Sequence, residues 1–226
     1  MGRHLIWDWN GTLLDDTTLV VQATNDAFAS CGGPRVDIEH HRRGFRRPVA
    51  EYYAEVLGRP LDEAEFAVID KVFHASYRAL LAAGCSLTPG AVDALEEWQR
   101  AGRTQSLLSM AFHDELVDLV KRYQISEYFS RIDGLRAAVG GGTKVGHLIE
   151  HLRHIGLEGP DCVVVGDSLD DAVAAEAVGA RCVLVDTGVT HTERLRATGL
   201  PVASGPAEAV AFILGETGLP PVQTVA

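Results

Sequence analysis

The sequence predicts an α/β fold in which a doubly wound parallel sheet carries an inserted all-helical block. Four short apolar runs, at residues 5–8, 104–109, 162–166 and 182–186, are continuous and rich in valine. Such runs are typical of strands that are covered on both faces. Amphipathic helical patterns lie between them, and strands that alternate with helices of this length form a parallel sheet.

The first helix of the predicted core follows the inserted block. Thr88 and Pro89 have the residue types of an N-cap and a first helical position, and Gly102 is placed to end the helix. Three apolar residues at helical spacing are expected to form its buried face: Val92, Leu95 and Trp98.

Two further core helices are predicted between the later strands. The first carries an apolar stripe and is closed by Gly156. The second, at residues 169–178, is rich in alanine and stops at Gly179. The stripe of the first helix consists of Val145, Leu148, Ile149 and Leu152.

Residues 15–87 interrupt the alternation and contain helical patterns only. We expect three or four consecutive helices there, over about 17–31, 48–57 and 62–83. This division predicts a core of residues 1–14 and 88–226 and a helical cap of residues 15–87, which lies over the loop at Asp8. The tail after Gly215 contains few core residues, and we expect it to be loosely ordered.

Composition excludes several classes of protein. A chain of 226 residues with 46% hydrophobic residues can bury a sizeable core. No apolar stretch reaches the ~18 to 20 residues that a membrane span needs, and the N-terminus lacks a signal-peptide pattern, so we expect a cytoplasmic protein without membrane partners. The net charge of −11 argues against nucleic-acid binding. The four cysteines are scattered singly, which predicts reduced thiols: Cys31, Cys85, Cys162 and Cys182.

The segment from residue 4 to residue 15, HLIWDWNGTLLD, carries the strongest chemical signal. Its apolar run delivers Asp8 to the end of a strand, where Asn10, Gly11 and Thr12 turn the backbone sharply. A carboxylate beside a turn with outward-pointing amides suits a nucleophile that attacks a phosphoryl group. Gly11 and Thr12 are therefore candidates for binding the phosphate of a substrate.

A second acidic cluster follows the strand at residues 162–166 and contains Asp167 and Asp171. Ligands of open α/β sheets bind at the carboxyl ends of the strands, so Asp8 and Asp167 are expected to converge there. Carboxylates at one point repel unless a cation joins them, and oxygen ligands beside a phosphate favour Mg²⁺. The alternative is that these aspartates only cap the next helix.

Two further polar residues are candidates for phosphate binding. Ser109 is expected to end the second strand, where its hydroxyl could donate to a phosphate oxygen, although such a serine is usually a turn former. Lys144 opens a helix after a glycine-rich stretch and could neutralise phosphate charge. For any single lysine, a solvated surface position is the alternative.

The order of Asp8, Ser109, Lys144 and the pair Asp167/Asp171 resembles the four motifs of the haloacid dehalogenase (HAD) superfamily, over about residues 4–190. The resemblance implies a Mg²⁺-dependent phosphatase of a small phosphorylated metabolite. It implies that Asp8 forms an aspartyl-phosphate and that Ser109 and Lys144 hold the phosphoryl group. It also implies that the cap is like that of phosphoglycolate phosphatases and β-phosphoglucomutases and sets substrate specificity. The implied metal ligands are Asp8, the backbone carbonyl of Asn10, and Asp167, with support from Asp171.

Asn10 departs from the pattern, because the first motif of the superfamily is usually Asp-x-Asp-Gly-Thr. The second Asp of the family protonates the leaving oxygen and later takes a proton from water, and a carboxamide does neither. The resemblance therefore implies a slow phosphatase unless another group replaces this Asp; the candidates are Asp15, His113 and His191. Two alternatives stay open: a regulatory protein that binds a phosphorylated ligand without turnover, and a phosphotransferase or mutase.

Residues 35–47 form a basic island in an acidic chain. Five arginines and two acidic residues give this stretch a net charge of +3. Arg43, Arg46 and Arg47 are candidates for recognising a second anionic group of the substrate. The alternative is a solvated helix surface or ion pairs with the acidic core. The stretch lacks the interleaved aromatic residues that nucleic-acid binding would favour.

Overall fold

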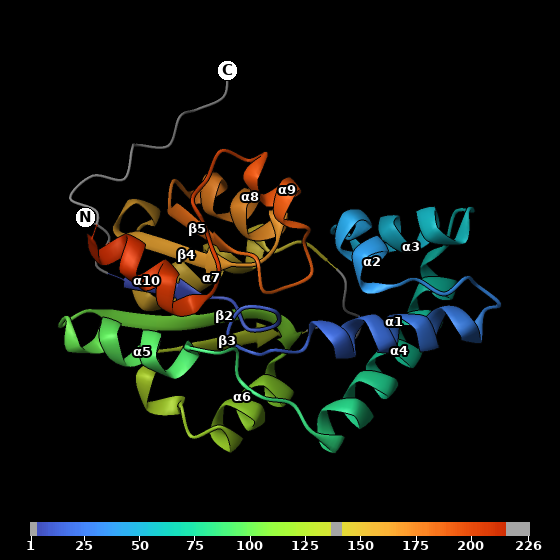
Figure 1. Ribbon diagram of the computed structural model, residues 1–226, viewed down its shortest axis with the longest axis horizontal. Helices are drawn as coiled ribbons and strands as arrows, with labels where there is room; N and C mark the ends of the chain where they lie inside the picture. Colours follow the sequence, from blue (N-terminus) through green and yellow to red (C-terminus); the bar gives the residue numbers. More distant parts are fainter. Residues whose placement is uncertain (1–3, 137–141, 216–226) are drawn as a thin grey trace.

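The computed structural model describes residues 4–136 and 142–215 and contains one parallel sheet. The order of its six strands is β3-β2-β1-β4-β5-β6, and every neighbouring pair is parallel (Figure 1). Strands β2 and β3 are added on one side of β1 and strands β4 to β6 on the other, and this change in the order of strands confirms the doubly wound α/β class. The strands are β1 (His4–Trp7), β2 (Thr104–Phe112), β3 (Ile132–Leu135), β4 (Cys162–Gly166), β5 (Arg181–Val185) and β6 (Val202–Ala203).

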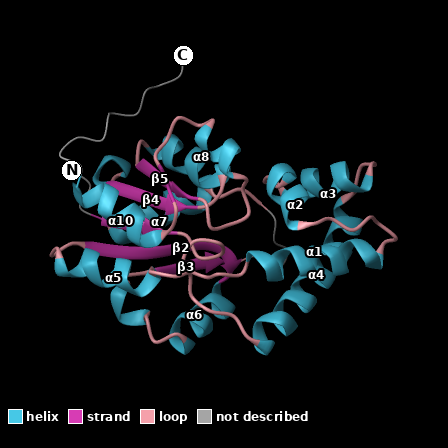
Figure 2. Cartoon of the chain, in the orientation of Figure 1, coloured by secondary structure: helices cyan, strands magenta, loops and turns pink. Residues whose placement is uncertain are grey.

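Helices cover both faces of the sheet. One buried cluster joins the sheet to α5 (Ala91–Arg100), α6 (His113–Arg122) and α10 (Pro206–Gly215). A second cluster joins the opposite face to α7 (Val145–Ile155), α8 (Leu169–Val178) and α9 (Thr192–Arg196). Figure 2 shows the strands of the sheet with helices packed around them. The predicted core helix at residues 169–178 is confirmed with the same bounds.

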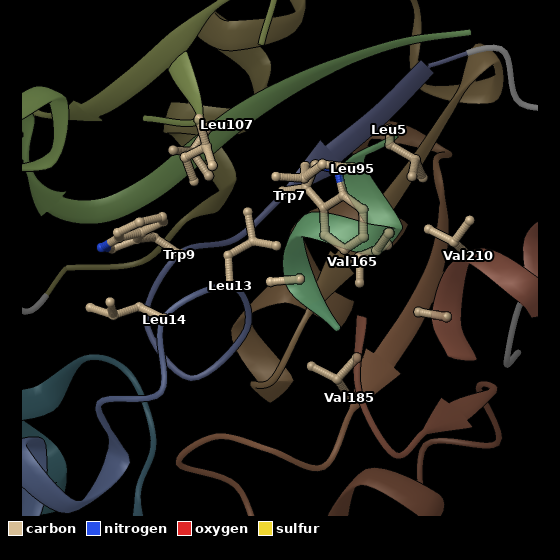
Figure 3. Close-up of a cluster of buried hydrophobic side chains, with 14 of the residues drawn as sticks. Leu5, Trp7, Trp9, Leu13, Leu14, Leu95, Leu107, Val165, Val185 and Val210 are labelled. Atoms are coloured by element: carbon tan, nitrogen blue, oxygen red, sulfur yellow. The ribbon is translucent and has the colours of Figure 1, made fainter. Parts of the chain in front are cut away.

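Strand β1 shows how side-chain alternation builds the two-sided core. Leu5 and Trp7 point into the first cluster, where Trp7 lies among Leu95 and Val165 (Figure 3), whereas Ile6 points into the second. The residues are all buried, which explains why the strand is apolar without interruption. Trp7 pairs with Val165 of β4, so the residues that follow these two strands emerge at the same edge of the sheet.

Four helices are inserted between β1 and α5, and they have a small core of their own. They are α1 (Thr17–Ser30), α2 (Ile38–Gly44), α3 (Val49–Leu57) and α4 (Glu63–Ala83), and they lie to one side of the sheet (Figure 1). Phe28, Tyr52, Tyr53 and Ile69 are among the buried residues of this core. The three ranges predicted from sequence correspond to α1, α3 and α4, and α2 is the additional helix.

Several predicted boundaries are wrong. Strand β2 continues to Phe112, past the expected end at Ser109, with an irregularity in its pairing with β3. The edge strands β3 and β6 were not predicted, because they are short and only partly apolar. Thr88 is not an N-cap: its backbone N–H donates to the carbonyl of Leu13, and the helix begins at Ala91 after Gly90, whose φ of 78° is left-handed.

Two residues assigned to buried helix faces are exposed. Val92 is 37% exposed and Ile149 is 52% exposed, because the buried faces of their helices are centred on Leu95 and Leu148 instead. The four cysteines are free, and Cys162 and Cys182 are buried as expected. The predicted loose tail after Gly215 lies outside the described residues.

Among the helices within residues 4–136 and 142–215, the structure contains none that is both long and apolar enough to cross a bilayer.

Candidate active site

The loop after β1 places Asp8 at the carboxyl edge of the sheet. The Asp8 backbone N–H donates to the Val165 carbonyl at 2.8 Å, which fixes the carboxylate beside the end of β4. Gly11 then turns the chain with a φ of 67°. A Cβ on Gly11 would lie 2.8 Å from Asp167 Oδ2, so only glycine allows the loop to approach the second carboxylate this closely.

Lys144 joins two of the carboxylates. Its ammonium Nζ donates to Asp8 Oδ1 and to Asp171 Oδ1, each at 2.6 Å, and all three side chains are buried. Burial raises the pKa of Asp8 to about 6, although the nearby ammonium opposes this shift. Burial by itself lowers the pKa of Lys144, but the two carboxylates outweigh it and raise the pKa. Lys144 is therefore a charged, immobile group at the site.

Asp167 has no cationic partner among the described residues and depends on backbone groups. Its Oδ2 accepts from the Val189 N–H at 2.6 Å. Burial raises its pKa well above the ordinary range, and the charges of Asp8 and Asp171 raise it further. A Cβ on Gly188 would come within 1.8 Å of the same oxygen, which makes Gly188 necessary for this position of the carboxylate.

Asp171 caps a helix and also belongs to the charged cluster. Its Oδ2 accepts from the backbone N–H of Ser168, while the Ser168 hydroxyl accepts from the Asp171 N–H, so the two form a capping box at the start of α8. Its other oxygen, Oδ1, accepts from Lys144. Capping the helix and contributing to the charged cluster are thus compatible.

The cluster fits a divalent cation. Carboxylate oxygens of Asp8, Asp167 and Asp171 lie within 4.8 Å of one another, and all three residues are buried. Three carboxylates with a single ammonium leave an excess of two negative charges in a desolvated position when all are ionised. A hard cation with oxygen ligands offsets that excess, and Mg²⁺ is bound in proteins by one or two carboxylates beside a phosphate.

Asn10 is held by two partners, Asp16 of the same loop and Tyr77 of α4. Its amide Nδ2 lies 2.7 Å from Asp16 Oδ2 and 2.7 Å from the Tyr77 hydroxyl. Both contacts orient the amide nitrogen away from Ser109, whose Oγ lies 3.4 Å from Asn10 Oδ1. Asp16 also accepts from the Gly11 N–H at 2.8 Å. The buried carboxylate next to position 10 is therefore Asp16, and Asn10 is its hydrogen-bond donor.

A cavity between the sheet edge and the inserted helices connects these groups. Asp8, Asn10, Ser109 and Lys144 line it from the core, together with Asp167 and Asp171. The inserted helices contribute polar residues and aromatic rings to the same cavity, including Arg47, Asp70, Phe73, His74 and Tyr77. Enclosed carboxylates at the strand ends and a separate helical wall form a site in which a small anionic molecule can be surrounded.

The comparison with protein families agrees with this geometry. The model of the haloacid dehalogenase-like hydrolases matches residues 3–179, which is more than half of the chain. The protein belongs to this family of hydrolases.

Curated relatives of this haloacid dehalogenase-like hydrolase are bacterial enzymes. Phosphoglycolate phosphatase 1 of Pseudomonas aeruginosa is 27% identical over 198 residues, which cover 84% of this chain and 71% of that protein. Phosphoglycolate phosphatase of Mesorhizobium japonicum is 26% identical over 193 residues, with 82% and 83% coverage.

Solved structures support the fold of this hydrolase. A predicted phosphatase from Clostridium acetobutylicum superposes with a TM-score of 0.84 at 16% identity, covering 96% of this chain and all of that one. A predicted phosphoglycolate phosphatase from Haemophilus somnus gives a TM-score of 0.72 at 17% identity, with 94% and 98% coverage.

The three candidate arginines of the hydrolase are not equivalent. Arg47 lines the cavity, with its Nε 3.9 Å from Asp170 Oδ2. Arg43 pairs with Glu39 at 2.8 Å and is more than half exposed, and Arg46 pairs with Glu55 at 2.5 Å. Neither of these two lines the cavity. Arg43 and Arg46 form ion pairs with glutamates of the inserted helices rather than of the core, and Arg47 is the one of the three that lines the cavity.

The predicted phosphate-binding turn is used differently from our expectation. The Gly11 N–H donates to Asp16, and the Thr12 N–H donates to the Trp9 carbonyl at 3.2 Å, so both amides serve the loop itself. Neither residue lines the cavity. Ser109 does, and its Oγ accepts from the Ala111 N–H at 3.0 Å, although it lies within β2 rather than at its end.

Sequence reasoning missed the polar face of α4 and the role of Asp16. Tyr77 was not among the candidate site residues, although its hydroxyl donates to Asp16 at 2.5 Å. Asp70 and His74 lie four residues apart on the same helix, and this spacing of two titratable residues beside an apolar stripe was the available signal. Asp15, His113 and His191, the predicted replacements for the missing acid, do not line the cavity.

Proposed function

We propose that this hydrolase is a Mg²⁺-dependent phosphatase of a small phosphorylated metabolite and that Asp8 is its nucleophile. The observation that carries the proposal is the buried position of Asp8 between the Lys144 ammonium and two further carboxylates, on the wall of an enclosed cavity. A carboxylate needs no deprotonation before it attacks phosphorus, and a desolvated one is a better nucleophile than one in water.

In the proposed reaction the side chains of the core have separate tasks. Lys144 holds Asp8 Oδ1, which leaves Oδ2 to form the bond to phosphorus. Ser109 and Lys144 line the cavity beside Asp8 and are assigned to bind the oxygens of the transferred phosphoryl group. Asp8, Asp167 and the Asn10 backbone carbonyl would hold Mg²⁺ with support from Asp171, and the bound ion supplies charge stabilisation for the phosphoryl oxygens.

Asn10 constrains how the proposed reaction proceeds. Its carboxamide has no proton to transfer at neutral pH, and both hydrogens of its amide group point to Asp16 and Tyr77. Proton transfer therefore limits turnover of alkyl phosphates unless another group of the cavity provides it, and such transfer typically contributes about 10² to 10⁴ in rate.

The proposed substrate is a small phosphorylated carboxylic acid. The relatives described above are phosphoglycolate phosphatases, and Arg47 is the arginine that reaches the cavity from the proposed cap at residues 15–87. A guanidinium recognises a carboxylate with two parallel hydrogen bonds. The substrate would place its phosphate at Asp8 and its second anionic group toward Arg47.

A panel of phosphorylated metabolites, with 2-phosphoglycolate included, tests the proposal. Phosphate release is measured with Mg²⁺, with a chelator, and for Asp8→Ala beside the wild type. We expect release from at least one alkyl phosphate that requires both Mg²⁺ and Asp8. Release that persists in Asp8→Ala would contradict the mechanism. Adding alcohols as acceptors tests the phosphotransferase alternative.

A further inference from the structure

The helical wall of the cavity contains a histidine and an aspartate that the mechanism above does not use. Asp70 and His74 lie one turn apart on α4 and both line the cavity that contains Asp8. Their side chains are 10% and 17% exposed. Among the cavity-lining residues that the structure describes, His74 is the single imidazole.

The imidazole of His74 is held on three sides. Its ring packs against Phe112 of β2 at a centroid distance of 4.6 Å and against Phe73 at 5.1 Å. Its Nε2 lies 3.4 Å from Asp70 Oδ1, within ion-pair distance. Nδ1 has no hydrogen-bond partner within the described part of the chain. One nitrogen thus faces a carboxylate, and the other is available to a ligand.

The other titratable side chains from the helical wall and from α6 are less suited to proton transfer. Burial raises the pKa of Tyr77 and of Tyr53, so both phenols keep their protons. Glu115 is paired with Arg78 at 2.7 Å. His74 is the group whose chemistry matches the need, because an imidazole can both donate and accept a proton.

We propose that His74 is a catalytic residue that supplies the proton transfer missing at Asn10, and that Asp70 is the positioning residue that orients its ring. The arrangement of a carboxylate, an imidazole and an open ring nitrogen follows the general logic of nucleophile and base pairs, in which a third group orients the base. This inference rests on the proposed function, because it needs Asp8 to react with a phosphate ester.

As Asp8 Oδ2 bonds to phosphorus, the bond between phosphorus and the ester oxygen breaks, and that oxygen takes the proton from Nδ1 of the imidazolium. The neutral Nδ1 then takes a proton from the water that attacks phospho-Asp8. The bond between phosphorus and Asp8 breaks and its electron pair returns to the carboxylate. Alcohol and phosphate leave, and His74 is protonated again.

First-turnover measurements with two leaving groups test the proposal. The substrates are the best alkyl phosphate of the panel and acetyl phosphate, whose acetate leaves without a proton. For His74→Gln we expect alcohol release to slow by about 10²-fold, acetate release to change by less than about threefold, and the phosphoenzyme to decay more slowly. Asp70→Asn should slow alcohol release by about tenfold in the same selective way. His113→Gln removes a histidine that does not line the cavity and is the matched control.

The outcomes separate this inference from the proposed function. A wild type that forms no phosphoenzyme from either substrate overturns both. A wild type that reacts normally, with His74→Gln slowing alcohol and acetate release equally or slowing neither, overturns the role of His74 alone. His74→Asn is the second variant if His74→Gln does not fold, and thermal unfolding of each variant is recorded beside the rates.

Discussion

Strand β1 carries a buried polar side chain at each of its ends, and the two surroundings differ in charge. At its start, His4 belongs to a chain of hydrogen bonds that runs through Ser106 and His151 to Asp133, with distances of 2.7 to 2.8 Å. Just after its end, Asp8 belongs to a cluster of carboxylates that a single lysine only partly neutralises. The same strand therefore ends in two different polar clusters. In one, every polar group has a hydrogen-bond partner, and in the other, negative charges outnumber positive charges.

The hydrogen bonds of the His4 chain can all be assigned with both histidines neutral. Asp133 accepts from His151 Nδ1, Ser106 donates to His151 Nε2, and His4 Nε2 donates to Ser106, while Thr104 donates to His4 Nδ1 at 2.8 Å. Burial lowers the pKa of His4 to about 4, which agrees with this assignment. A buried network in which every group has a partner stabilises the fold. The charged cluster at the other end carries excess negative charge, which a bound cation would offset.

The sharpest test of this comparison is Asp8→Asn. We expect phosphate release to fall by at least about 10⁴-fold, because the covalent route is closed. We also expect an unfolding free energy that is no lower than that of the wild type in the presence of a chelator. The substitution removes one of three carboxylates that burial disfavours, as the raised pKa of Asp8 indicates. Urea unfolding and a phosphate assay measure the two quantities, and a large loss of stability would contradict the comparison.

The opposite end should respond in the opposite way. His151→Ala breaks two buried hydrogen bonds and leaves a cavity, and we expect it to lower the unfolding free energy by about 3 kcal/mol. The folded fraction should keep kcat within about threefold. His154→Ala, at an exposed position of the same helix, is the control and should be neutral in urea unfolding. Equal effects of the two substitutions would show that the network contributes nothing.

Substitutions at Asn10 and Asp16 test how much negative charge the loop after β1 tolerates. Asn10→Asp would put a second carboxylate 2.7 Å from Asp16 Oδ2, and we expect a loss of about 2 kcal/mol in unfolding free energy. Adding Asp16→Asn should restore most of that loss, because one carboxylate and one amide again face each other. A double-mutant cycle in urea measures the coupling. Purely additive effects would mean that the two side chains do not interact.

The two ends should also differ in their response to acid. His4 has a pKa of about 4 in the native state and an ordinary value of 6.5, so below pH 6.5 the unfolded state binds the proton first. Its contribution to stability therefore decreases by about 2 kcal/mol between pH 7.5 and pH 5. The raised pKa of Asp8 has the reverse sign, because there the native state binds the proton first and stability is lost as the pH rises.

Urea unfolding of His4→Gln at several pH values measures the contribution of His4. Without the titrating ring, we expect the loss of stability between pH 7.5 and pH 5 to be about 2 kcal/mol smaller than in the wild type. His154→Gln should keep the wild-type dependence. A pH dependence in His4→Gln identical to that of the wild type would rule out a neutral native His4.

The smallest predicted effect concerns Arg47, which lines the cavity from the inserted helices. Arg47→Ala should raise KM for the best substrate more than about tenfold, or about 1.4 kcal/mol, with Mg²⁺ dependence unchanged. Arg43→Ala and Arg46→Ala remove guanidiniums that pair with glutamates away from the cavity, and we expect changes below about threefold. Steady-state kinetics of the three variants with one substrate measure these changes in KM. Similar KM values in all three would remove Arg47 from substrate recognition.

Local patterns in the sequence were sufficient for the α/β class and for the helical insertion. Continuous valine-rich runs, helical spacing and glycine stops act over a few residues, and α8 was predicted with its observed bounds for this reason. The edge strand β6 was not predicted, because its two residues are too few to form a recognisable pattern and pair only with β5. Asp8, Asp167 and Asp171 were expected to meet because parallel strands end at one edge of a sheet.

Tertiary structure alone decided which polar side chains meet across long distances in the chain. Arg43 pairs with Glu39 four residues earlier on the same helix, which is a local pairing. The position of Arg47 on the cavity wall, by contrast, depends on how the inserted helices pack against the core. Likewise, the contact of Asn10 with Tyr77 depends on how α4 packs beside the loop after β1. The residue types and the strand ends were therefore determined by sequence, whereas the partners of each charge were determined by packing, since electrostatic contacts depend on distances that the order of residues does not contain.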